Sequence, residues 1–241
     1  MLAFARRCTK EILRDPATIF FGLGFPLILL LLLSTLQKNI PTPLFEINDL
    51  APGICVFGLS FFSLFAATLV AKDRESAFLQ RLYTTPLTAA DFILGYTLPL
   101  LPLALLQSLL CLLASVPLGL SVGVNTLFAL ISIFPIALLH ISLGLLCGSM
   151  LNAKQVGGIC GALLTNLTAW LSGIWFDLSL IGGLFEKIAT ALPFYHAVEL
   201  AKTLQHGNYE AVALHLLSPI FSAFLITGLS IFCFLRQMQR L

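Results

Sequence analysis

Long uninterrupted apolar stretches, separated by short polar segments, are the feature that most restricts how this chain can fold. An α-helix rises about 1.5 Å per residue, so roughly 20 apolar residues cross a hydrocarbon core of about 30 Å. The stretches have this length and lack the alternation of barrel strands, so they predict helices. We expect six spans, at about residues 17–36, 51–71, 92–118, 125–150, 156–176 and 211–235. The predicted fold class is all-α integral membrane, with residues 1–241 forming a single transmembrane domain.

The composition agrees with a membrane class and argues against some partners. The chain is 59% hydrophobic and only 10% charged, whereas soluble domains average roughly 25% charged residues. Its net charge of +2 is too small to indicate a nucleic-acid partner. The lipid bilayer is therefore the first predicted partner of the chain.

The positive charges predict the orientation in the membrane. Six spans would place both termini on one side, and ten of the 13 Lys and Arg residues fall on that side. Only Lys38, Lys187 and Lys202 fall on the opposite side. Because loops that stay in the cytoplasm carry the excess of Lys and Arg, both termini are predicted to be cytoplasmic, in an inner or plasma membrane.

Residues 1–15 predict an amphipathic helix that lies at the membrane surface. On a helical wheel one half gathers Phe4, Ala5, Cys8, Ile12 and Leu13. The other half carries the charged residues, and Asp15-Pro16 ends the helix. Such a helix suits the interface of an anionic membrane.

A second amphipathic helix is predicted after the second span, beginning at Asp73. Phe78, Leu79 and Leu82 share one side of its wheel with Tyr83. Thr84-Thr85-Pro86 would end it, because proline lacks an amide donor and restricts the preceding residue. This charged segment lies between two predicted spans, so it would face water at the membrane surface.

Polar residues within the spans are few. Thr165, Asn166 and Thr168 cluster in the predicted fifth span, where they either join helices or line a translocation path. His140 is expected to be a neutral imidazole that bonds a neighbouring helix. Glycines four residues apart, Gly144 with Gly148 and Gly157 with Gly161, predict close helix packing.

The segment before the last span predicts a different structure. Residues 175–210 are too polar for a simple span and too apolar for a free loop, and residues 178–192 are the part expected to enter the outer leaflet. We expect a re-entrant or external helical segment there.

Two sequence stretches resemble those of a known family. The stretch KDRESAFLQRLYTTPL, from Lys72 to Leu87, resembles the loop motif of the membrane subunits of type-2 ABC exporters, and LPFYHAVE, from Leu192 to Glu199, is similar to their last external loop. The resemblance implies an ABC exporter permease that pairs with a second copy or a close relative and with separate cytoplasmic ATPase subunits. It also implies that the loop helix is a coupling helix that docks on the ATPase, through Asp73, Arg74, Glu75, Ser76, Phe78, Leu79, Arg81 and Leu82.

No catalytic or cofactor site is predicted within the chain. It has no GxxxxGK[ST] loop, and the glycines at Gly157, Gly158 and Gly161 lack the lysine that such a loop needs. Paired carboxylates, His clusters and metal-ligand spacings are missing from the spans, and the six cysteines have no CxxC spacing. The chain is therefore predicted not to be an enzyme, and ATP would be bound by the partner subunit.

Two other functions remain open at this point. An ion-driven secondary carrier would need ionisable groups at depth in the membrane, and His140 is the clear candidate for one. A membrane assembly protein without transport activity would explain plain spans but leaves the charged loop helix unexplained.

Overall fold

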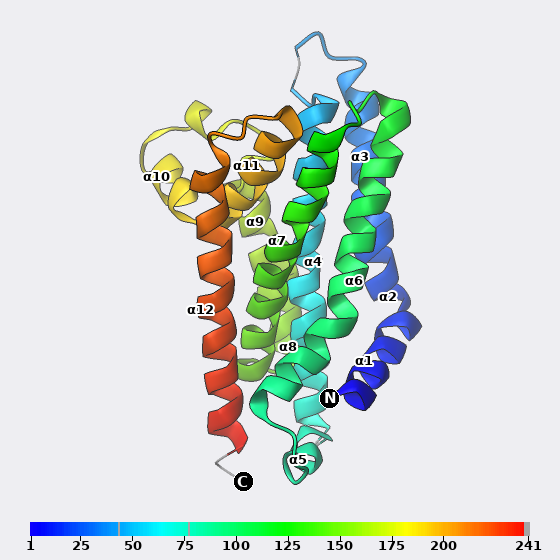
Figure 1. Ribbon diagram of the computed structural model, residues 1–241, viewed down its shortest axis with the longest axis vertical. Helices are drawn as coiled ribbons and strands as arrows, with labels where there is room; N and C mark the ends of the chain where they lie inside the picture. The colour runs from blue at the N-terminus through cyan, green and yellow to red at the C-terminus, as the bar shows by residue number, and fades with distance from the viewer. Residues whose placement is uncertain (43, 77, 239–241) are drawn as a thin grey trace.

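The computed structural model describes residues 1–42, 44–76 and 78–238, and within them the chain forms helices and turns without strands (Figure 1). Ala77 of the loop motif lies outside the described residues. In chain order the helices are α1 (Leu2–Arg14), α2 (Pro16–Ile19), η1 (Phe20–Gly24), α3 (Phe25–Gln37), α4 (Ile47–Glu75), α5 (Phe78–Tyr83), α6 (Ala89–Ser115), η2 (Val116–Leu118), α7 (Val124–Met150), α8 (Ala153–Val156), η3 (Gly157–Leu164), α9 (Thr165–Leu171), η4 (Leu178–Leu180), α10 (Gly183–Ala191), α11 (Pro193–His206) and α12 (Val212–Met238).

Five helical stretches of the described chain are long and apolar enough to cross a membrane. They cover Pro16–Gln37, Ile47–Glu75, Ala89–Leu118, Val124–Met150 and Val212–Gln237. The predicted fifth span, residues 156–176, is instead divided among α8, the π-helix η3 and α9, and its helical part ends at Leu171. A multi-pass helical protein is thus confirmed, whereas the layout with six spans stays a prediction.

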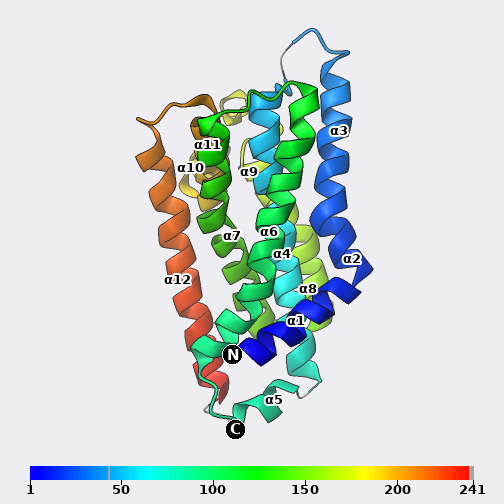
Figure 2. The same cartoon turned by 45° about the vertical axis from the view of Figure 1, so that its right-hand side comes forward.

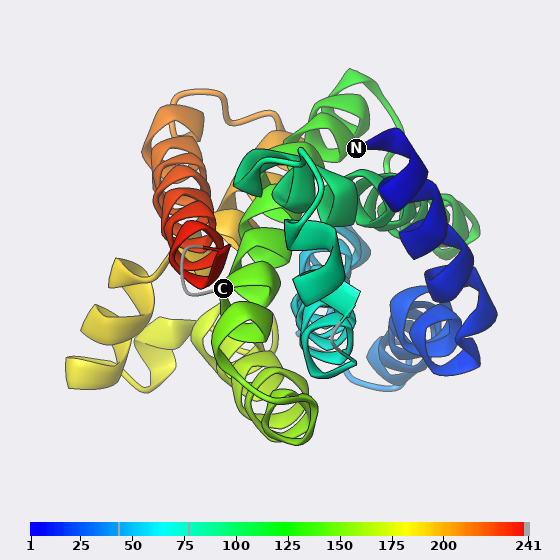
Figure 3. The ribbon, with the colours of Figure 1, turned by 90° about the horizontal axis from the view of Figure 1, so that it is seen from below.

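Helix α4 forms the centre of the bundle. In an apolar stretch of 18 residues within α4, 89% of the residues are buried, whereas the corresponding stretch of α12 is 17% buried. Helix α4 is therefore surrounded by protein, and α12 lies at the periphery. Seen from below, α4 lies among α3, α6 and α7, with α12 at one edge (Figure 3). Structural changes in α4 would therefore reach most of the other helices.

Close packing of α7 on α4 depends on two glycines. A Cβ atom at Gly144 would clash with the backbone carbonyl of Ser63, and one at Gly148 would lie 2.6 Å from the carbonyl oxygen of Ala67. The predicted packing role of this pair is confirmed. The second predicted pair differs, because Gly157 faces open space and Gly161 only meets the Leu64 side chain at 3.4 Å.

Substituting Gly144 by alanine should destabilise the protein, because the neighbour it meets is backbone and cannot rotate away. Overpacking of this kind costs about 1–3 kcal/mol, and thermal unfolding in detergent would measure it as a lower midpoint. Gly228→Ala is the matched control, since a Cβ atom added at Gly228 of α12 would meet no neighbouring atom within 4 Å outside the helix backbone. The control should be neutral or stabilising, because alanine favours helix more than glycine does. Equal midpoints for both variants would contradict the packing role of Gly144.

Helix α1 crosses the lower ends of α4 and α6, where "lower" means the end of the bundle that carries α5 (Figure 2). Its buried residues are Phe4, Ala5, Cys8 and Ile12, four of the five predicted for the apolar face. Leu13, the fifth, is 62% exposed.

Helices α10 and α11 lie at the other end of the bundle (Figure 1). They show that the segment before the last span is helical, as predicted.

Candidate functional site

Asp73 is a buried carboxylate at the lower end of α4. Its side chain is only 2% exposed and accepts a hydrogen bond of 2.8 Å from the hydroxyl of Tyr96 on α6. It also forms an ion pair with Arg7 of α1, and Arg7 reaches Glu11 at 2.8 Å. We name Arg7, Glu11, Asp73 and Tyr96 the Asp73 cluster. A buried carboxylate needs such partners because desolvation of an unpaired charge is costly, and here the partners join α1, α4 and α6.

The Asp73 cluster keeps the Arg7 guanidinium in its charged form. Burial lowers the pKa of Arg7, but the hydrogen bond and the negative charge of Asp73 outweigh that effect and raise the pKa above its usual value. The guanidinium therefore stays protonated beside the carboxylate. The positive partner of Asp73 therefore keeps its charge throughout the physiological pH range.

Arg74, the next residue, connects α4 to the end of α7. Its guanidinium donates to the carbonyl oxygens of Ser149 and Leu151, the latter at 2.7 Å. These carbonyls lie at the carboxyl end of α7, where a cation also interacts favourably with the helix dipole. Gln237 of α12 donates to the same Ser149 oxygen at 2.6 Å. Arg74 thus joins α4 to α7, and through a shared acceptor to α12.

Glu75, the last residue of α4, holds the beginning of α8. Its carboxylate accepts a hydrogen bond of 2.8 Å from the backbone amide of Ala153, the first residue of that helix. Carboxylates are favoured at such positions because the first amides of a helix have no partner within it. Three successive residues of α4 therefore contact α1 and α6, α7, and α8.

The structure corrects the predicted start of the loop helix. Asp73 does not begin a new helix, because α4 continues to Glu75 and a separate short helix, α5, follows from Phe78. The physical reason is that Asp73 and Arg74 find partners inside the bundle, so the span extends through them. Asp73 is therefore too deeply buried to touch a soluble partner from this position.

Helix α5 turns its apolar side inward. Leu79 is fully buried, and Phe78 and Leu82 are partly buried against the main core. The Phe78 ring stacks on Phe4 of α1 with centroids 6.4 Å apart. The Arg7 guanidinium lies 4.5 Å from the Phe78 centroid, a cation–π contact that also involves the Asp73 cluster. A displacement of α5 would therefore also displace residues of α1 and α4.

The exposed residues of this region form its water-facing surface. Among the described residues from Glu75 to Leu82 they are Glu75, Ser76, Gln80 and Arg81. Arg81 has no ion pair in the described part of the chain. Of the eight residues predicted to dock an ATPase, Glu75, Ser76 and Arg81 lie on this surface, whereas Asp73 and Leu79 are buried. Docking itself remains a prediction.

The polar residues predicted for a translocation path differ in exposure. Thr165 and Thr168 are buried and donate to carbonyl oxygens of their own helical segment, Cys160 at 3.0 Å and Leu164 at 2.9 Å. Asn166 is exposed on the outside of the single subunit and donates to the Ala162 carbonyl at 2.7 Å. Their role in a translocation path remains a prediction, and Asn166 is the one of the three whose side chain is exposed.

His140 is fully buried between α4 and α11. Its Nδ1 lies 3.4 Å from the hydroxyl of Ser63, and its ring lies 5.8 Å from that of Phe194. No hydrogen bond or ion pair joins it to a carboxylate in the part of the chain that the structure describes. The surroundings fit the predicted neutral imidazole better than a proton carrier.

Comparison with known proteins identifies the family. The family model of the ABC-2 type transporter matches residues 1–206. Among relatives, the transport permease ycf38 of Porphyra purpurea is 34% identical over 138 residues, which are 54% of this chain and 47% of that protein. Its counterpart from Pyropia yezoensis is 35% identical over 97 residues, which are 38% of this chain and 33% of that one. The chain thus matches about half or less of the length of these relatives.

The family match agrees with the resemblance that the loop motif and the external loop carry. It covers α1, the Asp73 cluster, α5 and the helices up to the end of α11. Since that is most of the 241 residues, the chain belongs to the ABC-2 type transporter family of membrane transport permeases.

Proposed function

We propose that the chain is the membrane subunit of an ATP-driven exporter, and that separate cytoplasmic ATPase subunits dock at its lower end. The observation that supports this most is the set of contacts at the end of α4. There, Asp73, Arg74 and Glu75 connect the segment next to α5 with α1, α6, α7 and α8. A soluble partner that moves α5 would act on most of the bundle at once.

The docking surface would be the exposed side of α5 together with the end of α4. Gln80 and Arg81 supply polar and positive groups there, and Glu75 and Ser76 extend the surface. The inward side chains Phe78, Leu79 and Leu82 would not touch the partner. They would instead transmit its movement to the core, since they pack against it.

A layout with six crossings is part of the proposal. The α8–α9 segment runs from the lower end of the bundle toward the upper end (Figure 1), which supports counting it as a span beside the five long helical stretches. With six crossings both ends of the chain would be cytoplasmic, in agreement with the distribution of Lys and Arg. The membrane would be the inner or plasma membrane of the cell.

A dimer would complete the translocation path. Asn166 is a polar group on the lipid-facing outside of one subunit, and Gly158 and Ala162 precede it at four-residue intervals, all exposed. Small residues at this spacing allow close approach of a second helix, and an amide there gains a hydrogen-bond partner. We propose that a second copy, or a close relative, packs near this face and that an amphipathic or apolar molecule moves outward between the subunits.

Gentle solubilisation of the tagged chain from its native membrane tests the proposal. An ABC-type ATPase should co-purify in a ratio near one per permease, and the mixture should hydrolyse ATP. A protein that is repeatedly recovered intact, without any ATPase and without ATP turnover, would contradict the proposal. It would favour a carrier driven by an ion gradient, for which His140 would be tested next.

A further inference from the structure

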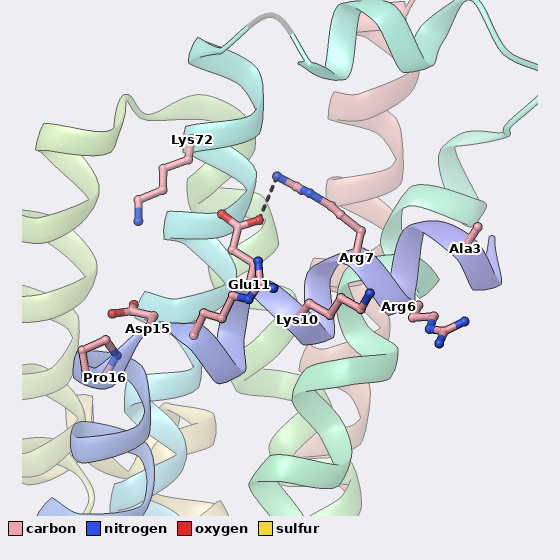
Figure 4. A pocket seen from close by; sticks show the side chains of 9 residues that line it. Ala3, Arg6, Arg7, Lys10, Glu11, Asp15, Pro16 and Lys72 are labelled. Atoms are coloured by element: carbon pink, nitrogen blue, oxygen red, sulfur yellow. Dashed lines mark ion pairs between the residues drawn. The ribbon is translucent and has the colours of Figure 1, made fainter.

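A strongly basic groove lies between α1 and the lower end of α4 (Figure 4). It has a volume of about 720 Å³. Its charged lining residues are Arg6, Arg7, Lys10, Arg14 and Lys72, with Glu11 and Asp15 as the acids. Five cations against two acids leave an excess of three positive charges. An open groove with such a charge excess attracts anions.

Most of these cations are not neutralised by the protein. Arg7 is engaged with Glu11 and Asp73. Asp15 uses its carboxylate to accept hydrogen bonds from the hydroxyl of Thr18 at 2.7 Å and from the amide of Ala17 at 3.2 Å. The cations without an ion pair in the described chain are Arg6, Lys10, Arg14 and Lys72. They come from two elements that are far apart in the sequence, so the groove exists only in the folded protein.

An apolar groove adjoins the basic one on the other side of α1. It has a volume of about 400 Å³ and lies between α1 and α6. Its apolar lining includes Leu2, Ala5, Leu98 and Pro99, and it shares Arg6 and Lys10 with the basic groove. Leu2 and Leu98 are 72% and 42% exposed, so apolar surface is available next to the shared cations.

The two grooves together match the chemistry of a lipid. We propose that they bind an anionic phospholipid of the leaflet at the lower end, with its phosphate near Arg6 and Lys10, which line both grooves, and an acyl chain between α1 and α6. A free phosphate would use only the basic groove, and a neutral lipid would leave the cations unpaired. The adjacency of both grooves on one helix therefore favours the anionic lipid.

The bound lipid would stabilise the region that contains the Asp73 cluster. Arg7 lines the basic groove and pairs with Asp73, so a lipid that holds α1 in place also holds this ion pair. A ligand that binds the folded state alone stabilises it, and above Kd this stabilisation rises with the logarithm of the ligand concentration. The inference goes beyond the proposed transport function, because it concerns the lipid partner and does not require an ATPase.

Lipid titrations of the purified, detergent-solubilised chain test the proposal. Dioleoyl phosphatidylglycerol, dioleoyl phosphatidylcholine and inorganic phosphate are each added while the unfolding midpoint is recorded, and native mass spectrometry counts the lipids retained. Phosphatidylglycerol should raise the midpoint by several degrees and remain bound in one copy per chain. Phosphatidylcholine and millimolar inorganic phosphate should have little effect. An equal rise with inorganic phosphate would overturn the proposal in favour of a soluble anion.

A charge-matched pair of variants separates a site from diffuse attraction. Each Lys or Arg near an anionic surface contributes roughly a fivefold gain in binding, so Arg6→Gln with Lys10→Gln should weaken phosphatidylglycerol binding about 25-fold. The control, Arg81→Gln with Lys154→Gln, removes two exposed cations at the same end that do not line the groove. It should change binding less than about twofold. Equal losses in both pairs, or no loss in the first, would overturn the proposal. Unfolding midpoints measured without lipid show whether each variant is folded.

Discussion

Asp73→Asn is expected to destabilise the protein by about 3 kcal/mol, because breaking a buried ion pair leaves an uncompensated partner. The carboxylate is 2% exposed, whereas the side chain of Arg7 is 38% exposed, and this exposure of Arg7 puts the expected cost at the lower end of the usual range. Tyr96 would keep an acceptor in the asparagine oxygen, so the loss reports on the charge. For a chain of this size about 2–4 °C of midpoint accompanies each kcal/mol, which thermal unfolding in detergent resolves.

Two further variants isolate the pair itself. Arg7→Gln combined with Asp73→Asn should cost less than the sum of the single changes, since the partners contact each other. Asp49→Asn is the exposed counterpart, because Asp49 pairs with His206 at 2.8 Å and both side chains are over 40% exposed. Its cost should stay below about 1 kcal/mol. If Asp73→Asn were as mild as Asp49→Asn, the Asp73 cluster would not hold the lower end together.

Charge reversal of Arg81 is expected to weaken ATPase association at least about tenfold and to remove most transport. Arginine residues often dominate binding at interfaces, and a like-charge contact in a complex costs several kcal/mol. Arg81 is exposed on α5 and has no ion pair in the described chain, so Arg81→Glu should leave the fold intact. Quantitative co-purification of the ATPase measures the loss, with the unfolding midpoint as the measure of folding.

Lys187→Glu is the matched control for Arg81→Glu. Lys187 is also exposed and carries the same charge, but it lies on α10 at the opposite end of the bundle. The control should retain the ATPase at the level of the wild type. Equal retention by the two variants would place the docking surface elsewhere than on α5.

Much of the helical fold can be predicted from the sequence, because hydropathy and periodicity are local properties. Span-length apolar runs give most of the long helices. The inward face of α1 follows from the helical repeat of Phe4, Cys8 and Ile12. The exposure of Leu13 shows the limit of this reasoning, since a residue near the end of the wheel's apolar half can face either way.

The Asp73 cluster could not be predicted, because its partners are distant in the chain. Asp73 lies 66 positions from Arg7 and 23 from Tyr96. A wheel of residues near Asp73 shows only a charged helix start, so the sequence assigned it to a water-facing surface. The division of the predicted fifth span among α8, η3 and α9 could not be predicted either. The i to i+5 hydrogen bonds of the π-helix η3 do not change the hydropathy of the sequence.

ATP hydrolysis by the complex that purifies with this chain, compared between the wild type and Arg81→Glu, tests most directly whether a separate ATPase docks on α5. We expect ATPase activity with the wild type, close to the same activity with Lys187→Glu, and little or none with Arg81→Glu at an unchanged unfolding midpoint. A wild-type preparation that is folded but carries no ATPase activity would contradict the claim that this permease works with a separate ATPase. Full activity in Arg81→Glu would contradict the claim that α5 is where the two meet.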